Sequence, residues 1–325
     1  MIANSAGAAA SPFSVMNAQP LDRAKFRDPL RTVLGDARAS VTLQKLETLW
    51  INTGTQCNLA CKTCYIESSP TNDALVYMTL AEVDAFLDEA EALGIHEIGF
   101  TGGEPFINPD MVAMMRSALK RGFEVLVLTN AMRPMRRFDD QLAALRTEFD
   151  QQLTMRVSLD HYTQALHEAE RGPNSWAKAI AGCRWLSEHG FRLAIAGRSL
   201  VGESEAAARA GYAGLFAENG LSIDAFDPAA LVLFPEMDDA ADVPEISEGC
   251  WDVLGIAPAS MMCSSSRMVV KRKGAARPTV VACTLIPYDD RFALGETLAG
   301  AQGAVSLNHP HCARFCVLGR ASCSA

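Results

Sequence analysis

The sequence predicts an α/β fold: an open, partial (β/α)6 TIM-like barrel followed by a small C-terminal module with a β-hairpin and many cysteines. From residue 46 to residue 243, β-rich runs alternate with segments of helical periodicity, which is typical of a parallel sheet with right-handed crossovers. Six such units make a partial barrel rather than a closed eight-fold one. After about residue 244 the alternation ends, and five of the ten cysteines lie between residues 263 and 323.

Local signals set the expected elements. Thr79-Leu-Ala-Glu82 is a capping box that opens a helix, and Gly94 ends that helix. Asn108-Pro109 is expected to cap the next helix, with the proline in the first helical position. The expected strands are 48–53, 95–101, 123–129, 153–159 and 191–200, with a sixth inside 231–234 or 221–226. The expected helices are 79–93, 109–120, 138–149, 175–188 and 205–218.

The chain divides into three parts by composition and pattern. Residues 1–45 are expected to form a partly disordered arm, because the first twenty are rich in small and polar residues. Residues 46–243 form the predicted barrel, and residues 244–325 form the C-terminal module. In that module two β-rich runs, 268–270 and 279–282, flank a basic turn that contains glycine, which predicts a hairpin.

Composition and charge exclude several classes of function. The net charge of −9 disfavours a nucleic-acid partner, since phosphate binding needs a basic surface. No apolar run approaches the roughly 20 residues that span a bilayer, and no secretory signal precedes the first expected strand. Ten cysteines without an export signal indicate metal ligation in a reducing compartment rather than disulfides. We therefore expect a cytoplasmic protein with no membrane partner.

Three cysteines follow the first expected strand directly. Cys57, Cys61 and Cys64 have the spacing C-x3-C-x2-C, and their loop holds no fourth cysteine or histidine. A four-iron cube normally takes four thiolates, so three would leave one iron open to an exogenous ligand. The alternatives are a zinc site completed from elsewhere, or buried thiols that only pack. Zinc knuckles usually have two C-x2-C pairs and this loop has one, so the spacing favours an iron–sulfur cluster.

Polar and glycine residues also follow the other expected strands. Active sites of parallel barrels form at the carboxyl ends of the strands, so these residues are expected to meet at one rim. They are Gly102, Gly103, Asn130, Ser158, Asp160, Arg198 and Ser199. The clustering predicts a cofactor site at that rim, to which all seven contribute.

The cysteine loop resembles the motif of the radical S-adenosylmethionine (radical SAM) superfamily. In that family the motif reads C-x3-C-x2-C with an aromatic residue beside the last cysteine, and here Tyr65 follows Cys64 where the family residue precedes it. Gly102-Gly103-Glu104-Pro105 resembles the family's GGEP motif. The resemblance implies that the glycines let the backbone approach the methionyl ammonium of S-adenosylmethionine, and that Glu104 adds charge there.

The fourth expected strand carries a further resemblance. Ser158-Leu159-Asp160, with Arg171-Gly172 downstream, is similar to a family pattern, which implies Ser158 and Asp160 near the ribose or methionyl part. Arg171 would pair with the carboxylate, because a guanidinium offers a planar fork of donors; the alternative is a solvated loop charge. Arg198 and Ser199 are a weaker match to a segment that packs on adenine. His161 stands where many relatives have glycine, so the substrate side is expected to differ.

The C-terminal cysteines resemble the Twitch or SPASM appendage of one radical SAM subgroup, which holds an auxiliary iron–sulfur cluster. They are Cys263, Cys283, Cys312, Cys316 and Cys323. Five thiols suffice for one [4Fe-4S] cluster, and we favour Cys263 and Cys283 plus two of the other three. Structural zinc is the alternative, since thiolates suit both metals and His309 or His311 could replace a thiol.

The resemblance implies an oxidoreductase-like radical SAM enzyme. With a [4Fe-4S] cluster and S-adenosyl-L-methionine as cofactors, it would reductively cleave S-adenosylmethionine to methionine and a 5′-deoxyadenosyl radical. The radical would take a hydrogen atom from a small-molecule or natural-product substrate, with net oxidation or rearrangement, and a flavodoxin- or ferredoxin-type donor would supply the electron. The alternatives are a peptide-modifying maturase, against which the missing N-terminal docking domain weighs, and a non-catalytic iron–sulfur or zinc redox sensor.

Overall fold

The computed structural model describes residues 11–15 and 18–323. Its main feature is a nine-stranded sheet with the order β10-β9-β8-β2-β3-β4-β5-β6-β7. Strands β8 to β7 in this order pair in parallel, whereas β9 and β10 pair antiparallel. Because this order has two ends, the sheet stays open, as predicted. The central strands are β2 (Thr48–Asn52), β3 (Glu97–Thr101), β4 (Glu124–Thr129), β5 (Leu153–Ser158), β6 (Arg192–Arg198) and β7 (Leu231–Phe234).

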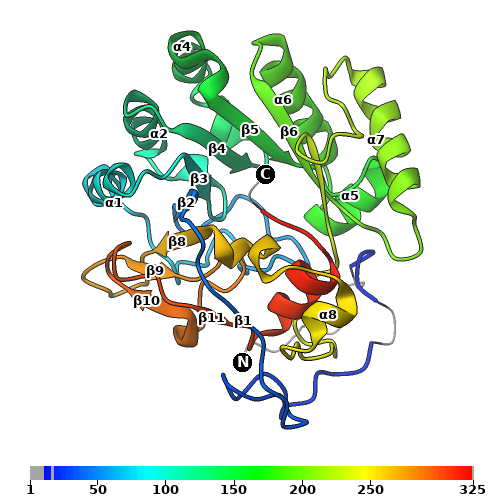
Figure 1. Cartoon of the computed structure of the whole chain (residues 1–325). Helices are drawn as coiled ribbons and strands as arrows, with labels where there is room; N and C mark the ends of the chain where they lie inside the picture. The colour runs from blue at the N-terminus through cyan, green and yellow to red at the C-terminus, as the bar shows by residue number, and fades with distance from the viewer. Residues whose placement is uncertain (1–10, 16–17, 324–325) are drawn as a thin grey trace.

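Helices fan around the outer face of this sheet (Figure 1). The helices that follow the parallel strands are α1 (Leu80–Ala92), α2 (Met111–Lys120), α3 (Arg133–Arg136), α4 (Asp139–Phe149), α5 (Gln164–Arg171), α6 (Trp176–Glu188) and α7 (Glu205–Asn219). Their apolar faces and the outward side chains of the strands form one buried core, to which Cys183 of α6 belongs. The alternation of strand and helix predicted from the sequence is therefore confirmed, with the sixth strand inside 231–234.

Two local predictions at helix starts have different outcomes. The capping box is confirmed, because the Thr79 side chain accepts from the backbone of Glu82 and the Glu82 side chain accepts from that of Thr79. The cap at Asn108-Pro109 is wrong, because α2 begins at Met111 and Asp110 is its N-cap residue. Asn108 is instead buried, and its amide donates to the carbonyl oxygens of Thr53 and Met78, which holds the end of β2 in place.

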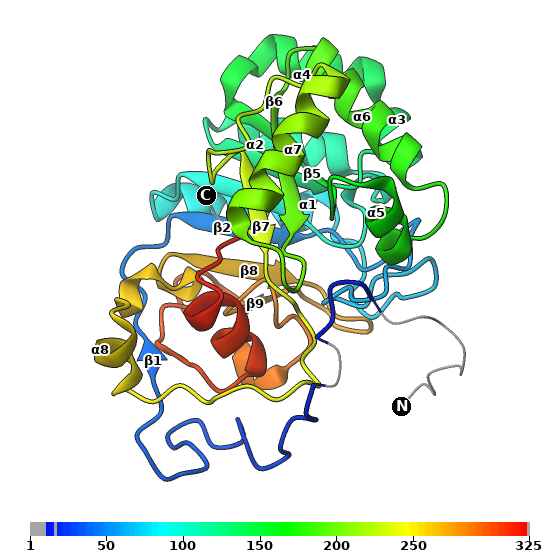
Figure 2. The ribbon, with the colours of Figure 1, turned by 90° about the vertical axis from the view of Figure 1, so that its right-hand side faces the viewer.

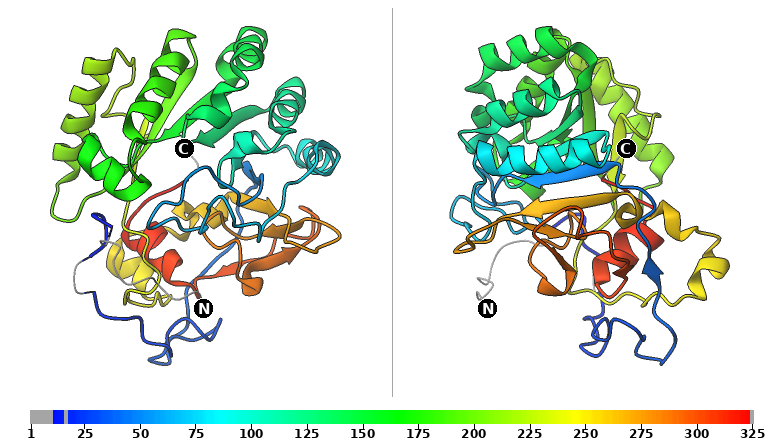
Figure 3. Two further views of the ribbon diagram at one scale, coloured as in Figure 1. Left: turned by 180° about the vertical axis from the view of Figure 1, so that it is seen from behind. Right: turned by 60° about the vertical axis from the view of Figure 1, so that its left-hand side comes forward.

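The C-terminal module continues the sheet instead of packing on its edge. Strand β8 (Ser266–Val270) pairs in parallel with β2, and β9 (Thr279–Val281) pairs antiparallel with β8 to form the predicted hairpin. β10 (Ala293–Gly295) completes the sheet. The rest of the module, with α8 (Cys250–Leu254) and the π-helical turn Cys312–Leu318, packs on the side opposite the helices (Figure 2). Figure 3 shows the same layers from two further sides.

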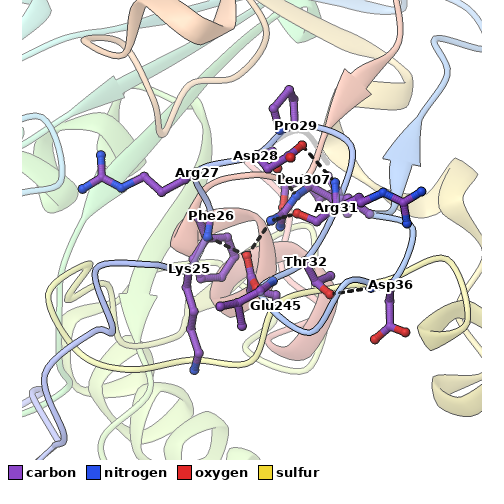
Figure 4. Close-up of polar contacts among 12 residues, drawn as sticks. Lys25, Phe26, Arg27, Asp28, Pro29, Arg31, Thr32, Asp36, Glu245 and Leu307 are labelled. Carbon is purple, nitrogen blue, oxygen red and sulfur yellow. Dashed lines mark hydrogen bonds and ion pairs between the residues drawn. The ribbon is translucent and has the colours of Figure 1, made fainter.

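The N-terminal segment lies along this module. β1 (Ser40–Val41) pairs antiparallel with β11 (Val305–Ser306). Phe26 and Val33 lie upstream of β1. Their backbone N–H groups donate to the buried carboxylate of Glu245, at 2.5 Å and 2.6 Å, as Figure 4 shows for Phe26. Glu245 also pairs with the guanidinium of Arg38 at 2.5 Å. The predicted disorder of the first residues concerns positions that lie mostly outside the described residues.

We expect the substitution Glu245→Ala to lower the free energy of unfolding by about 3–5 kcal/mol, because it leaves the buried Arg38 charge without its partner. Both side chains are almost fully buried, at 1% and 4% exposure. Urea denaturation of the purified protein measures the change. Glu148→Ala, which removes the surface pair with Arg116, serves as the control and is expected to have little effect. Equal stability of the two variants would contradict the structural role of Glu245.

Within residues 11–15 and 18–323, no helix combines the length and the apolar character needed to cross a bilayer.

Candidate active site

A cavity, here called the chamber, opens at the carboxyl ends of the parallel strands. All the residues predicted for the cofactor site line it except Glu104 and Ser199. The predicted residues in its wall are Cys57, Cys61, Cys64, Tyr65, Gly102, Gly103, Asn130, Ser158, Asp160, Arg171 and Arg198. Residues not predicted for this site also line it, among them Thr63, Thr129, Glu170, Phe315 and Cys323. The rim inferred from the ends of the strands is thus one continuous cavity.

The cysteine loop places its three thiols in the wall of the chamber. The backbone N–H of Leu59 donates to Cys57 Sγ and that of Ser68 donates to Cys64 Sγ, each at 3.4 Å. Burial raises the pKa of Cys57 to about 11 and that of Cys61 to about 12. Thiolates at these positions therefore need a positive partner, which a metal cluster supplies, and backbone N–H donors are usual neighbours of cluster sulfurs. The donor set fits the iron–sulfur cluster expected from the spacing.

Gly102 and Gly103 let the end of β3 approach the cysteine loop closely. A side chain at Gly102 would place its first carbon 2.5 Å from the Gly54 carbonyl oxygen, and the φ of +146° there disfavours any other residue. A side chain at Gly103 would lie 2.2 Å from the carbonyl oxygen of Gln56. The backbone N–H of Gly103 donates to Gly54, so the two loops are joined directly. The glycines are therefore required to bring the cysteine loop and the chamber wall together.

Glu104 lies behind the wall and not in it. Its carboxylate accepts from the hydroxyl of Thr129 and the backbone N–H of Asn130, each at 2.8 Å, and from the N–H of Phe106. Burial raises its pKa to about 7, although these hydrogen bonds lower it. In this arrangement Glu104 fixes the end of β4, and through it Asn130, whose amide lies 3.9 Å from Cys57 Sγ. Its predicted charge contact with the cofactor stays a prediction.

Asp160 and Arg171 form a closed pair in the wall. Arg171 Nε donates to Asp160 Oδ2 at 2.5 Å, and Arg171 Nη2 donates to Oδ1 at 3.1 Å. Burial alone would raise the pKa of Asp160, but the guanidinium outweighs it and the pKa is lowered. Burial lowers the pKa of Arg171, but the neighbouring Asp160 carboxylate raises it by more, so the net pKa is raised. The Nε and Nη2 donors of Arg171, which was predicted to pair with the carboxylate of the cofactor, therefore already pair with the carboxylate of Asp160.

Glu170 joins three distant segments beside the chamber. Its carboxylate accepts from the backbone N–H (2.8 Å) and the hydroxyl (2.7 Å) of Thr63 and from the hydroxyl of Ser11 (2.5 Å), and lies 3.3 Å from Arg198. The ring of Phe13 lies 4.8 Å below the same guanidinium. No sequence pattern pointed to Glu170, because its short helix α5 was not predicted. Ser199 is exposed, and its backbone N–H donates to Phe234, so its predicted cofactor contact has no support here.

The five C-terminal cysteines separate into two groups. Four of them line a second, small cavity in the module: Cys263, Cys283, Cys312 and Cys316. Cys323 lines the chamber instead, where its sulfur accepts from the hydroxyl of Thr284 (3.4 Å) and its carbonyl oxygen accepts from Arg156 (2.7 Å). Burial raises the pKa of all five thiols, to about 11 for Cys263 and about 12 for Cys312.

The grouping bears on which metal the module would hold. Among the described residues, no three His, Cys, Asp or Glu side chains converge closely enough to hold a single metal ion. A four-iron cluster binds each thiolate on a different iron, so its ligands surround a volume and need not converge on one point. Four thiols around one cavity are a donor set that suits a four-iron cluster, and thiolates also suit zinc.

A buried histidine makes the stability depend on pH. His167 of α5 is fully buried, both of its ring nitrogens lack a hydrogen-bond partner among the described residues, and burial lowers its pKa to about 4. An unfolded histidine binds a proton below pH 6.5 and folded His167 does not, so its contribution to stability is lost as the pH falls toward 4. Between pH 7 and pH 5, we expect the free energy of unfolding of His167→Phe to fall by about 1–2 kcal/mol less than that of the wild type. Urea denaturation at both pH values measures this, and equal losses for both proteins would contradict it.

Comparison with known proteins places part of the chain in a family. A family model described as the radical SAM superfamily matches residues 51–205, which include the cysteine loop and most of the chamber wall. This segment belongs to the radical SAM superfamily. The chain is 32% identical over 142 residues to the antilisterial bacteriocin subtilosin biosynthesis protein AlbA of Bacillus subtilis, covering 43% of this chain and 30% of AlbA. It is 29% identical over 182 residues to GTP 3′,8-cyclase 1 of Mycobacterium tuberculosis, covering 53% and 45% of the two chains. These alignments thus span less than half of either relative.

Solved structures share the fold of this chain. A structure of Streptococcus suis SuiB bound to S-adenosylmethionine superposes with a TM-score of 0.57 at 13% identity, over 77% of this chain and 63% of SuiB. A structure of anSMEcpe with bound AdoMet gives a TM-score of 0.56 at 14% identity, over 80% and 81%. At such identities the likeness concerns the fold alone, which confirms the mixed α/β architecture with a parallel sheet.

Proposed function

We propose that this protein is a radical SAM enzyme that abstracts a hydrogen atom from an organic substrate held in the chamber. When bound, a [4Fe-4S] cluster and S-adenosylmethionine supply the reductive cleavage that gives methionine and a 5′-deoxyadenosyl radical. One observation carries the proposal: three thiols of one short loop, Cys57, Cys61 and Cys64, line the same cavity as the glycine pair of β3. Three thiolates leave one iron of a cube for an exogenous chelating ligand.

The residues of the chamber would hold and orient these groups. The three cysteines would bind the cluster, and the backbone of Gly102 and Gly103 would face the methionyl ammonium. Asn130 and Ser158 line the wall between the cluster loop and β6 and offer polar groups for the ribose. Tyr65, whose phenol is buried among Cys64, Cys283 and Cys323, would exclude water from the space between the two groups of thiols.

Anaerobic reconstitution tests this function directly. The protein is loaded with iron and sulfide, reduced with dithionite and given S-adenosylmethionine, and 5′-deoxyadenosine is measured by chromatography. An enzyme of this class forms 5′-deoxyadenosine even without its substrate, whereas a non-catalytic redox sensor binds iron and forms none. A reconstituted protein with a full cluster and no 5′-deoxyadenosine would reject the proposal. In the cell we expect a flavodoxin- or ferredoxin-type protein in place of dithionite.

We further propose an auxiliary [4Fe-4S] cluster on Cys263, Cys283, Cys312 and Cys316, in keeping with the Twitch/SPASM subgroup. The placement of these four thiols around one cavity supports it. Such a cluster would accept an electron from the substrate, so that the net reaction is an oxidation. Iron and sulfide analysis distinguishes eight irons per chain from four, and metal analysis for zinc tests the structural alternative.

The substrate is a small molecule or a peptide. The M. tuberculosis relative named GTP 3′,8-cyclase 1 favours a small molecule, whereas AlbA, by its name a bacteriocin biosynthesis protein, favours a peptide. The mycofactocin maturase MftC of Mycobacterium ulcerans, 27% identical over 135 residues, also favours a peptide. Incubation of the reduced enzyme with candidate small metabolites or with short precursor peptides distinguishes the two, because only the true substrate increases the rate of 5′-deoxyadenosine formation.

A further inference from the structure

A further cavity lies at the amino ends of the parallel strands, whereas the chamber lies at their carboxyl ends. This amino-end cavity has a volume of about 590 Å³. Its wall includes the first residues of β2, β3 and β4, which are Thr48, Glu97 and Glu124, and it also includes Arg156 of β5. Within residues 11–15 and 18–323 the two cavities share no lining residue. The amino-end cavity is therefore separate from the chamber.

Arg156 is a buried cation that the fold leaves incompletely bonded. It is only 2% exposed, and its Nη1 donates to the carbonyl oxygen of Cys323 at 2.7 Å. Its Nε has no hydrogen-bond partner among the described residues. Arg267 of β8 is also fully buried, but its Nε, Nη1 and Nη2 all donate to backbone carbonyl oxygens. A buried donor without an acceptor is costly, so a bound acceptor is expected at Arg156 Nε.

Glu97 brings the opposite charge to the same cavity. The Thr48 hydroxyl donates to Glu97 Oε1 at 3.2 Å. Burial raises the pKa of Glu97, and the nearby Glu124 carboxylate also raises it, whereas Arg156 lowers it. The carboxylates of Glu97 and Glu124 therefore repel each other, and a positive group beside them would relieve that repulsion. The cavity thus offers an unused buried donor next to a pair of carboxylates.

We propose that the amino-end cavity binds a small zwitterion of the amino-acid type. The carboxylate of this ligand accepts from Arg156 Nε, and its ammonium group lies beside Glu97 and Glu124. A ligand with a carboxylate alone meets repulsion from the two glutamates, and a ligand with an amine alone leaves Nε without an acceptor. The site does not depend on the proposed function, because it lies outside the chamber.

Ligand-observed NMR on the anaerobically reconstituted protein tests the site with three probes: ¹³C-labelled glycine, acetate and methylamine. Titration of their line broadening gives an affinity for each probe. Arg156→Lys keeps the positive charge but removes the Nε donor, and Glu97→Gln keeps the shape of the side chain but removes its charge. Arg136→Lys is the matched control, because Arg136 pairs with Asp139 and lines neither cavity.

The wild type is expected to bind glycine more tightly than acetate or methylamine. Arg156→Lys is expected to weaken glycine binding about tenfold, because the carboxylate of glycine loses its buried donor. Glu97→Gln is expected to weaken glycine binding by a similar factor of about ten without weakening that of acetate, since it removes a charge that attracts ammonium and repels carboxylate. Far-UV circular dichroism and iron content equal to those of the wild type show that each variant is folded and loaded.

The site is overturned if the wild type broadens none of the probes, because solvent alone would then fill the cavity. It is also overturned if Arg156→Lys and Glu97→Gln bind glycine as tightly as Arg136→Lys does. Acetate bound as tightly as glycine, with no effect of Glu97→Gln on either probe, would overturn the zwitterion in favour of a simple anion. If Arg156→Lys does not fold, Glu97→Gln decides the test, because it preserves the volume of the side chain.

Discussion

Cys61→Ala is expected to hold about four fewer irons per chain than the wild type and to form no 5′-deoxyadenosine. Two remaining thiolates cannot keep a cube whose fourth iron must stay open, so the effect is close to complete and not graded. Iron and sulfide analysis and the visible absorbance of the anaerobic protein measure the first part, and chromatography measures the second.

Cys183→Ala provides the matched control. Cys183 is fully buried and packs in the helical core, far in sequence from both groups of thiols. It is expected to keep its iron and its activity, at the cost of some stability from the lost sulfur. If Cys61→Ala retained the iron of the wild type, the loop would not be the cluster site.

The second large effect concerns the choice among the five C-terminal cysteines. Cys316→Ala is expected to lose about four irons, because it removes one of four thiols around the second cavity, and to keep the radical SAM cluster. Cys323→Ala is expected to keep all of the iron, because Cys323 lines the chamber and not the second cavity. Electron paramagnetic resonance of the reduced proteins distinguishes one cluster from two.

This pair of variants also tests the alternatives to the ligand set. Loss of four irons from Cys323→Ala together with full loading of Cys316→Ala would exchange the roles of the two residues. If the four thiols around the second cavity of the wild type bound zinc instead of iron, the auxiliary cluster would be rejected and the four-thiol metal site would be retained. Both variants can therefore be tested before the substrate is known.

Most of the fold was predictable because strands β2 to β7 and the longer helices carry their own local signals, whereas the short helices α3 and α5 were not predicted. Alternation of apolar residues, glycine at helix ends and the capping box of Thr79 are all read within a few residues. The pairing of β8 with β2 was not predictable, since these segments lie more than 200 positions apart and neither sequence indicates which strand it pairs with. The same limit explains why the predicted hairpin could not be placed in the sheet from the sequence.

The candidate site was predictable where its chemistry depends on spacing. Cys57, Cys61 and Cys64 are close in sequence, and the strand ends of a parallel sheet must meet at one rim. Glu170 could not be found, because its role depends on contact with Thr63, 107 positions away. The pairing of Asp160 with Arg171 is likewise a matter of side-chain geometry that no motif encodes.

The parallel pairing of β8 with β2 has a consequence for electron transfer. The loop after β2 carries one group of thiols, and Cys263 and Cys283 flank the β8–β9 hairpin beside it. The interval between the two proposed metal sites is thus fixed by a hydrogen-bonded ladder and not by a hinge. A rate of electron exchange between them should accordingly be independent of solvent viscosity.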